Sequence, residues 1–443
     1  MRSFASFFCI ASALGCVVGC SGGSRPAGGL AEAEAGAAGR ASEAEGGATG
    51  ETVEATAGAG GAQDPVDCTK WGPVDEDETW APVAACPDGF DVPSSVEIGG
   101  AGTVLTIEPG TKLKFGDEAM LKVLTGAALA AVGTEDEPIL FTGWQPSPGS
   151  WGGILFHSNA LSNEISHAIV EYAGSTEGAS GNVTMSSKGG GRIKLTSTVL
   201  RRGAKFGLTV LETGGLVEFA DNTITENEGG AIRVEVAAVH ELNGEGNTIV
   251  DNGKDNQVSL EGLASRVEGD VTWPALSPAI YRVSPPGGGA TDITVKGHLT
   301  ISAGAIFEFV GGSGIGIDDG SSGLAALGTE DQPIIFRGVD GSGWSGIGYC
   351  ESNWASNALE HVEIYNALGP VPGYLICGPS SSGVGVGNLS DDMPSRLRVK
   401  NVTFGGPNNA KFDIGVTKPS VLEQEGTNTG TGVAGKLQVG VAG

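Results

Sequence analysis

The chain has 443 residues, with 52 acidic and 25 basic side chains, so its formal net charge is −27 at pH 7. Because phosphate binding needs a basic surface, this balance argues against nucleic acid as a partner. Glycine supplies 76 residues, well above the usual share of about 7%, but there is no Gly-X-Y period, which excludes collagen. Hydrophobic residues make up 40% of the chain, enough to bury a core, which excludes a fully disordered protein.

The N-terminus has the features of an export signal. Arg2 precedes an apolar stretch, residues 4–18, that is too short to span a bilayer but suits a signal peptide. The stretch ends in Val17-Val18-Gly19-Cys20, which resembles the lipobox of bacterial lipoproteins. This resemblance implies removal of residues 1–19, lipid on Cys20, and an exported protein at the outer membrane or cell surface of a Gram-negative bacterium. A secretory signal without lipid is the alternative.

Residues 20–64 contain mainly Gly, Ala, Ser, Thr and Glu and almost no large apolar side chain. Such a segment cannot bury enough surface to fold, so we expect a flexible tether between the lipid and the folded part. The membrane is then a partner of the protein through this lipid.

Four cysteines follow the signal and the lipidation site: Cys68, Cys86, Cys350 and Cys377. An exported protein meets an oxidising compartment, so two disulfides are expected. Three pairings are open, of which pairing by proximity gives Cys68–Cys86 and Cys350–Cys377. A metal site is the alternative, but no CxxC or Cys/His cluster supports it. Residues 65–95 are expected to form a disulfide-pinned cap.

An internal duplication organises the rest of the chain. Five ordered landmarks recur at an offset of about 194 residues, which grows to about 206 near the end. We therefore divide the folded part into copy 1, residues 96–290, and copy 2, residues 291–443. The matched segments are Leu105-Thr106-Ile107 with Leu299-Thr300-Ile301, 133–141 with 328–336, 151–154 with 344–347, Asn163 and His167 with Asn357 and His361, and Ala204-Lys205-Phe206 with Ala410-Lys411-Phe412.

A shorter period of 25 residues lies inside copy 1, where Ser197-Thr198-Val199, Asn222-Thr223-Ile224 and Asn247-Thr248-Ile249 recur. Each is followed by alternating apolar residues, which is typical of strands with one buried face. Each repeat then forms one turn of a β-solenoid, whose strands pair with those of the next turn. We expect Asn222 and Asn247 to stack in an internal hydrogen-bonded ladder.

Taken together, these elements resemble right-handed parallel β-helix proteins of the pectin-lyase-like type over about residues 96–443. The resemblance rests on the run 104–115, the Gly-Thr-x-x-x-Pro-Ile-x-Phe and Trp-x-Gly-Ile elements, and residues 163–172. It implies an all-β fold, a right-handed parallel β-helix solenoid behind the lipoprotein signal and tether. It leaves function open, because the fold carries lyases, hydrolases, adhesins and inert surface proteins.

Two histidines recur with the duplication, each followed by a glutamate: His167 with Glu171, and His361 with Glu363. A histidine beside a carboxylate can serve as a general base with its orienting group, or as half of a metal site. The alternative is a repeated scaffold element that helps the turns to pair. Because a scaffold element recurs in every copy whether or not it acts, we favour the scaffold.

Paired carboxylates are candidates for a calcium site of the kind that polysaccharide lyases use with an Arg or Lys base. The candidates are Asp318, Asp319, Glu330 and Asp331, and Arg201 with Arg202 forms a basic spot. Nothing in the sequence brings them together, and most Asp and Glu here lie in turn signals, where Asp caps the turn. No cofactor is therefore expected, and Ca²⁺ is the alternative.

Tryptophans are candidate sugar contacts, because an exposed ring can stack on the apolar face of a sugar. Trp151 and Trp344 recur with the duplication and are expected to be packed inside. Trp144 and Trp354 lie in turn-like segments and are the candidate ligand contacts.

Two functions fit this sequence. The first is a lipid-anchored, non-catalytic surface rod that binds polysaccharide or a cell-surface glycan, or has a structural or adhesive role. The second is a polysaccharide lyase or glycoside hydrolase. The sequence shows no convergent acid–base set, and its negative charge repels acidic polymers unless calcium bridges them. We therefore expect the first and assign no catalytic residue.

Overall fold

The structure is a computed structural model that describes residues 66–442, except 176–179, 187, 212, 262–265, 285–291, 318, 370–381, 388–392, 408 and 433–434. The predicted signal peptide and tether, with Cys20, lie outside the described residues. Cys377 and Asp318 lie outside them as well. No helix in the described part is long and apolar enough to cross a membrane.

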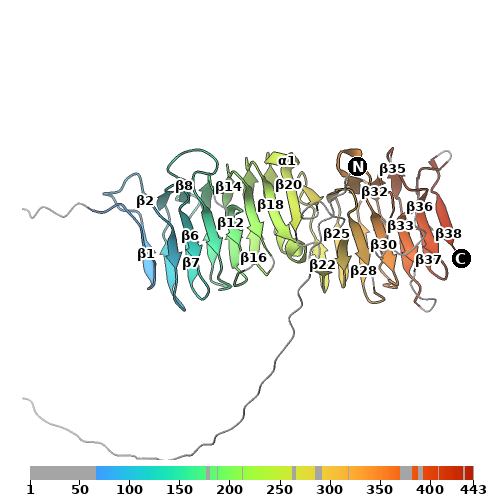
Figure 1. Ribbon diagram of the computed structural model, residues 1–443, viewed down its shortest axis with the longest axis horizontal. Helices are drawn as coiled ribbons and strands as arrows, with labels where there is room; N and C mark the ends of the chain where they lie inside the picture. Colours follow the sequence, from blue (N-terminus) through green and yellow to red (C-terminus); the bar gives the residue numbers. More distant parts are fainter. Residues whose placement is uncertain are drawn as a thin grey trace, which may run out of the picture. The chain divides into compact units, whose positions relative to one another are not determined.

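The chain folds into a parallel β-solenoid of ~12 turns, in which most turns contribute one strand to each of three sheets (Figure 1). Side chains alternate between a buried core and the outer face, as in β8, where Ile139 and Phe141 are buried and Leu140 and Thr142 are partly exposed. This alternation matches the period-2 patterns of the sequence. The all-β, solenoid part of the prediction is therefore confirmed.

One sheet, here named the long sheet, runs through both copies and contains 12 parallel strands. In spatial order these are β3 (Val96–Ile98), β6 (Met120–Val123), β9 (Gly153–Phe156), β12 (Gly181–Met185), β15 (Phe206–Val210), β18 (Gly230–Glu235), β20 (Gln257–Glu261), β23 (Ile280–Val283), β26 (Ile306–Phe309), β29 (Ile334–Gly338), β32 (Val362–Tyr365) and β35 (Thr403–Gly405). The two copies therefore share one continuous sheet.

Two sheets belong to the N-terminal half, defined as β1 to β20. The N-terminal six-stranded sheet contains β1 (Glu78–Trp80), β4 (Val104–Ile107), β7 (Ala128–Val132), β10 (Glu164–Ser166), β13 (Arg192–Thr196) and β16 (Gly215–Ala220). The N-terminal seven-stranded sheet contains β2 (Phe90–Val92), β5 (Lys112–Phe115), β8 (Ile139–Gly143), β11 (Ala168–Glu171), β14 (Val199–Arg201), β17 (Thr223–Thr225) and β19 (Thr248–Val250).

Two further sheets belong to the C-terminal half, defined as β21 to β38. The C-terminal seven-stranded sheet contains β21 (Arg266–Val267), β24 (Asp292–Val295), β27 (Gly314–Ile317), β30 (Gly346–Cys350), β33 (Ser382–Gly387), β36 (Phe412–Thr417) and β38 (Val439–Ala442). The C-terminal six-stranded sheet contains β22 (Asp270–Trp273), β25 (His298–Ser302), β28 (Gly323–Leu327), β31 (Ala358–Glu360), β34 (Arg396–Lys400) and β37 (Val421–Glu425).

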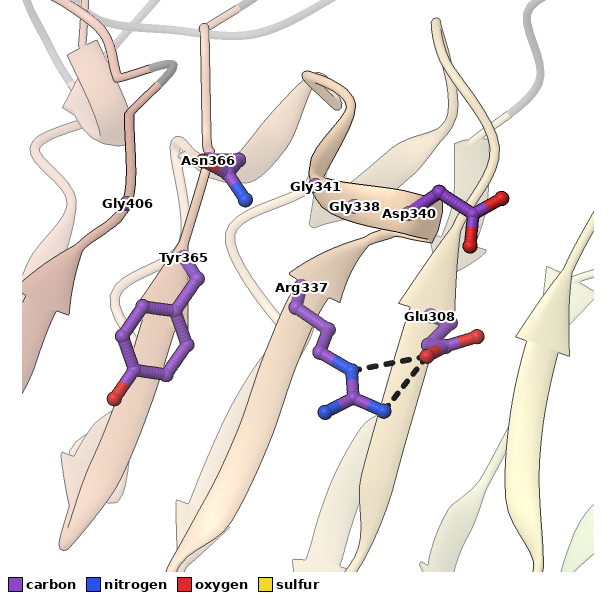
Figure 2. A pocket seen from close by; sticks show the side chains of 8 residues that line it. All are labelled: Glu308, Arg337, Gly338, Asp340, Gly341, Tyr365, Asn366 and Gly406. Atoms are coloured by element: carbon purple, nitrogen blue, oxygen red, sulfur yellow. Dashed lines mark hydrogen bonds and ion pairs between the residues drawn. The ribbon is translucent and has the colours of Figure 1, made fainter. Parts of the chain in front are cut away.

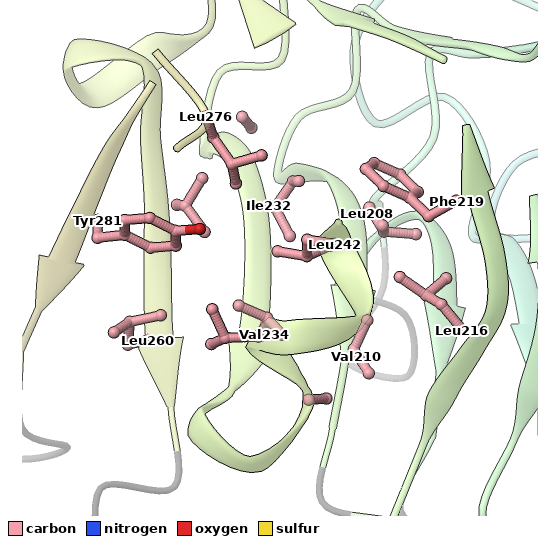
Figure 3. Close-up of a cluster of buried hydrophobic side chains, with 14 of the residues drawn as sticks. Leu208, Val210, Leu216, Phe219, Ile232, Val234, Leu242, Leu260, Leu276 and Tyr281 are labelled. Carbon is pink, nitrogen blue, oxygen red and sulfur yellow. The ribbon is translucent and has the colours of Figure 1, made fainter. Parts of the chain in front are cut away.

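A short 3₁₀ helix, η1 (Val236–Leu242), stands at the junction of the two halves. It buries Val236, Val239 and Leu242 and packs against β16 and β22 (Figure 3). Here the N-terminal six-stranded sheet ends, and the chain reaches β19 and β20 without adding another strand to it. Within the described residues, the other short helices are α1 (Gly253–Asn256) and η3 (Val339–Gly341).

The duplicated segments occupy different sheets in the two halves. The segment of Ile139 lies in the N-terminal seven-stranded sheet, whereas its counterpart around Ile334 lies in the long sheet. The segment of Trp151 leads into the long sheet, whereas that of Trp344 leads into the C-terminal seven-stranded sheet. Equivalent strands of the second half therefore lie one sheet further round the three-sided coil than their counterparts in the first half. The strand correspondence also extends back to β22, where Trp273 takes the place of Trp80.

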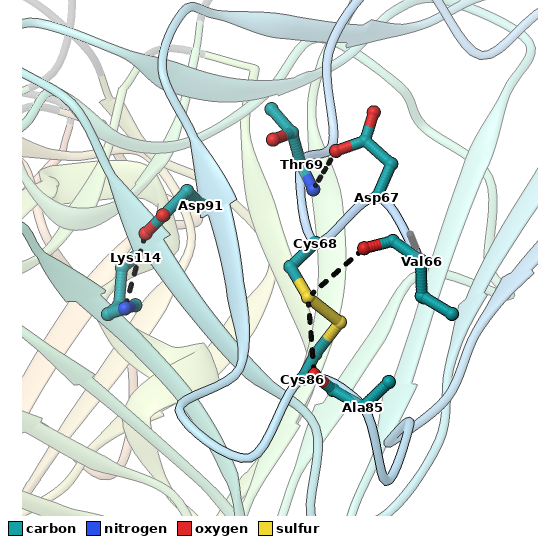
Figure 4. Close-up of a disulfide and its surroundings, with 8 residues drawn as sticks. All are labelled: Val66, Asp67, Cys68, Thr69, Ala85, Cys86, Asp91 and Lys114. Carbon is teal, nitrogen blue, oxygen red and sulfur yellow. Dashed lines mark hydrogen bonds and ion pairs between the residues drawn. A yellow bond between two sulfur atoms is a disulfide. The ribbon is translucent and has the colours of Figure 1, made fainter. Parts of the chain in front are cut away.

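The start of the solenoid is pinned by a disulfide between Cys68 and Cys86, which lie 18 residues apart (Figure 4). The predicted pairing of these two cysteines is confirmed. The neighbouring Lys70 lies 5.2 Å from the centres of the Trp80 and Phe90 rings. Cys350 is fully buried on β30 and is disulfide-bonded, but the predicted partner lies outside the described residues.

Asparagine ladders form between turns, as the 25-residue period predicts. The Nδ2 of Asn222 donates to Asn247 Oδ1 over 3.1 Å. A second ladder was not foreseen: Asn227 Nδ2 donates to Asn252 Oδ1 over 2.9 Å, and Asn182 Nδ2 donates to Asn227 Oδ1 over 3.1 Å. These bonds satisfy amides buried at the corners, where an unpaired polar group would be costly.

Candidate functional site

The two repeated histidines are corner residues. His167 lies between β10 and β11, and His361 between β31 and β32, each in the left-handed region with φ of 47°. Their carbonyls accept hydrogen bonds from the backbone N–H of Ile139 and Ile334, 3.1 Å in each case. The histidines therefore recur because the corner recurs.

The candidate histidine–glutamate pairs are not joined by a hydrogen bond or ion pair in the described structure. Glu171 binds Arg201 on the next turn, with an N–O distance of 2.7 Å, and accepts a hydrogen bond from Thr142. Glu363 accepts a hydrogen bond from the hydroxyl of Tyr365 over 2.9 Å. The two glutamates are not equivalent either, because Glu171 corresponds to Tyr365 at the duplication offset. Neither carboxylate orients its histidine.

The candidate calcium ligands do not converge in the described structure. Glu330 and Asp331 are exposed in a turn that Thr329 caps, its hydroxyl accepting the backbone N–H of Gln332 over 3.1 Å. Asp319 binds Ser321 and lies 3.8 Å from Lys296. Burial opposes ionisation of Asp319, but the bonds from Ser321 and its neighbour and the charge of Lys296 outweigh it, so its pKa lies below the usual value. Among described residues, no three His, Cys, Asp or Glu side chains are placed to hold a metal ion.

The tryptophans divide as the duplication predicts. Trp151 and Trp344 are buried and stack on Phe115 and Phe309, with ring centres 4.3 and 4.2 Å apart. Their indole N–H groups donate to the carbonyls of residues 171 and 365 over 2.7 and 2.8 Å. Trp144 is 46% exposed and remains a candidate contact.

Trp354 is half-buried, and its ring is less accessible to a ligand than that of Trp144. Its ring stacks on His298 with centres 4.4 Å apart, and it covers Gly323, where a Cβ would lie 2.2 Å from the indole. The most exposed tryptophan is Trp71, at 72%, which the sequence analysis missed. The sequence signal for its exposure was its place in a Lys-Trp-Gly-Pro segment close to the first disulfide cysteine.

The outer face of the long sheet carries a file of mainly polar side chains, with Leu155 of β9 and Gly405 of β35 as exceptions. In the C-terminal half, hereafter the Arg–Glu–Arg file, the register places Arg282 beside Glu308 and Glu308 beside Arg337. Arg282 Nη2 lies 2.9 Å from one Glu308 oxygen, and Arg337 Nη2 lies 2.7 Å from the other. Glu308 is thus held between two guanidinium groups with 11% of its side chain exposed.

Local sequence explains this file. Arg282 and Glu308 each lie within a strand between neighbours that point into the core, in Tyr281-Arg282-Val283 and Phe307-Glu308-Phe309, and Arg337 follows the buried Phe336. Beneath the file the rings of Tyr281, Phe307 and Phe336 stack, with centres 4.8 and 5.2 Å apart. The pairing of parallel strands, about 4.8 Å apart, sets the spacing both of this aromatic stack and of the charged groups above it.

Two hollows flank the file. One, of about 390 Å³, lies beside Arg337 at the corner of β29 and β32 (Figure 2). The other, of about 400 Å³, lies beside Arg282, whose Nε is buried without a hydrogen-bond partner among the described residues. The first hollow is lined by Glu308, Arg337, Gly338, Asp340, Gly341, Tyr365, Asn366 and Gly406, and the second includes Arg233, Lys254, Gln257, Ser259, Glu261 and Arg282.

This face can bind, but it offers little to a catalytic step. The carboxylate of Glu308 is shared by two arginines, and that of Glu261 lies 3.0 Å from Arg233. Both carboxylates are therefore engaged in ion pairs with arginine side chains. The same pairs present fixed donors and acceptors side by side, which suits a ligand rich in hydroxyl groups.

Sequence reasoning missed Arg282, Glu308, Arg337 and Tyr365. The available signal was a charged or polar residue flanked by aromatic or aliphatic ones, recurring in successive turns.

Residues 90–195 match a family described as a pectate-lyase like beta helix domain. This match lies in the N-terminal half, and with the strand pairing it confirms the pectin-lyase-like, parallel β-helix part of the resemblance. Neither the curated proteins nor the solved structures contain a match to the chain.

Proposed function

We propose that this protein is a non-catalytic, carbohydrate-binding surface protein, held in the outer membrane by lipid on Cys20. The observation that supports binding is the Arg–Glu–Arg file with a hollow on either side. Its two arginines share one carboxylate, so the file has only a small net charge and can offer hydrogen bonds to a neutral polymer. The regular spacing of the turns suits a linear chain of repeating units.

The anchoring part of the proposal rests on Val17-Val18-Gly19-Cys20 and on residues 21–64, which are mainly small or polar. Lipid on Cys20 would hold the protein in the membrane, and the tether would separate the solenoid from the headgroups. Cys20→Ser should release the protein into the soluble fraction, whereas unchanged membrane fractionation would contradict lipidation.

The function is tested with the full chain on a panel of soluble polysaccharides. Affinity electrophoresis measures binding to neutral and acidic polymers, and parallel reactions with and without calcium measure new reducing ends and unsaturated chain ends. We expect retardation by at least one neutral polymer and no new chain ends. Cleavage of any polymer would instead establish the alternative, a polysaccharide lyase or glycoside hydrolase.

A further inference from the structure

The corner beside Arg337 exists twice in the chain, once closed and once open. In the N-terminal half the corner after β11 and β14 is filled by Tyr172 and Arg202, whose Nη1 donates to the Tyr172 hydroxyl over 3.2 Å. Glu226 of the next turn completes it, with 2.7 Å from its carboxylate to Arg202 Nε. Three side chains from successive turns thus close the surface.

In the C-terminal half the counterparts of Tyr172 and Arg202 are Asn366 and Gly406. Asn366 keeps the left-handed backbone of its counterpart, with φ of 60° against 63°, but its side chain is much shorter. Gly406 has no side chain, and a Cβ there would lie 2.3 Å from Asn366 Oδ1. Two residue identities, Asn366 and Gly406 in place of Tyr172 and Arg202, therefore help to open the hollow of about 390 Å³.

The connection above this corner is also shorter. Between β29 and β30 the chain makes the tight turn η3, with Asp340 exposed at the rim and Gly341 at φ of 73°. The matching connection of the N-terminal half, residues 144–152, is longer and contains Pro146, Pro148 and the exposed Trp144. The shorter turn leaves the corner open to solvent.

The lining has the chemistry of a site for a hydroxyl-rich ligand. Arg337 stands between Glu308 and Tyr365 (Figure 2), and it holds Glu308 through Nε at 3.0 Å and Nη2 at 2.7 Å. The Tyr365 ring lies against Gly405, where a Cβ would be 3.0 Å away, and remains half-buried. An aromatic surface, a neutralised ion pair and a rim carboxylate then surround one space.

We propose that this corner pocket is a subsite for one neutral sugar residue of a polysaccharide, with its hydroxyl groups on Arg337, Glu308 and Asp340 and its apolar face near the Tyr365 ring. The proposal rests on the carbohydrate-binding function proposed above and locates it. With Asp340 at the rim, the two carboxylates of Glu308 and Asp340 balance the two guanidinium groups of Arg282 and Arg337. No net positive charge therefore attracts a uronate, and a neutral sugar is favoured. The volume falls within the range of about 300–1,000 Å³ that ligand pockets occupy.

The test closes this pocket with the residues of its own counterpart. Asn366→Tyr with Gly406→Arg copies the filled corner, and Tyr172→Asn with Arg202→Gly is the matched control on the other half. Because an arginine at position 406 strains the backbone, Arg337→Lys and Asp340→Asn are made in parallel, and circular dichroism checks that each variant folds. Full-length protein is titrated with hydroxyethyl cellulose, mannan, dextran and polygalacturonate.

We expect wild type and the control to bind the same neutral polymer, and the pocket variants to bind it at least about tenfold more weakly, a loss of about 1.4 kcal/mol. Undiminished binding by folded Arg337→Lys and Asp340→Asn would overturn the subsite and leave the carbohydrate-binding function standing. Binding of polygalacturonate alone would overturn the neutral-sugar class. Binding of none of the four polymers would overturn the proposed function and the subsite with it.

Discussion

The two halves of the solenoid share corner geometry and differ in what they place on it. His167 and His361 have the same φ, and Trp151 and Trp344 make the same stack and the same hydrogen bond to a corner carbonyl. The outer faces have diverged: where one half has Asp91 beside Lys114, the other has Arg282 beside Glu308, with the charges exchanged. The side chains that hold the backbone are therefore the same in both halves, whereas the side chains that face solvent differ.

The shift by one sheet adds a second difference. Equivalent outer faces lie on the N-terminal seven-stranded sheet in one half and on the long sheet in the other. The two halves therefore present equivalent outer faces on different sides of the coil. A ligand that lies along one side of the solenoid contacts this face in only one of the halves. The comparison is sharpened by substitutions at matched positions.

The largest loss of stability is expected at the two Trp–Phe stacks that both halves share. Trp151→Ala and Trp344→Ala should each lower the free energy of unfolding by about 3–5 kcal/mol, because each removes a buried indole and leaves a cavity. Trp144→Ala, at an exposed position, should change it by less than about 0.5 kcal/mol. Urea unfolding followed by circular dichroism measures all three. A loss in only one half would show that the corners are not energetically equivalent.

The second-largest loss of stability is expected to differ between the two halves. Glu308→Gln removes the charge between two arginines that are 16% and 39% exposed, and should destabilise the protein by about 2 kcal/mol. Lys114→Gln removes the equivalent charge, but its pair with Asp91 is 33% and 51% exposed, so the loss should stay below about 1 kcal/mol. Equal losses in the same urea titrations would contradict the buried character of the Arg–Glu–Arg file.

Backbone demands explain why much of the fold could be predicted from sequence. Gly133 and Gly328 recur because a Cβ there would lie 2.3 Å from the corner histidine's carbonyl oxygen in both halves. Trp151 and Trp344 recur because their stacks complete the core. Constraints of this kind leave the same residue in each copy, so the duplication itself reveals them.

The site could not be predicted in the same way, because its contacts join different turns. Glu171 lies four residues from His167, yet it binds Arg201, 30 residues away, since neighbouring strands come from successive turns. The one-sheet shift was hidden as well. It depends on η1 taking the place of a strand at the junction, and the 25-residue period continues across η1 without revealing this replacement.

A smaller effect tests the shared corner. Gly133→Ala and Gly328→Ala should each cost about 2 kcal/mol or less, because the added methyl group must push a backbone carbonyl aside. The two values should agree, since the nearest atoms lie at the same distances in both halves. Differential scanning calorimetry of the two variants checks this, and a stable Gly328→Ala protein beside an unstable Gly133→Ala protein would contradict a common corner.

The smallest effect is a pH dependence confined to the C-terminal half. Lys400 and Arg398 bind Glu360 and hold the pKa of that carboxyl below its ordinary value of 4.5. The equivalent pair of the N-terminal half is uncharged, with Thr196 donating to the Ser166 hydroxyl over 3.1 Å. Because the folded-state pKa is depressed, the unfolded chain binds the proton first as the pH falls.

The stabilisation by Glu360 is therefore complete above about pH 4.5 and is lost below it, toward the lower folded-state pKa. The groups are 22%, 36% and 33% exposed, so the effect should be under about 1 kcal/mol. Glu360→Ser with Lys400→Thr copies the uncharged pair and should remove this part of the acid sensitivity. Unfolding free energies of wild type and variant should converge as the pH falls from 6 toward 3; parallel curves would show that the ion pair does not contribute to stability.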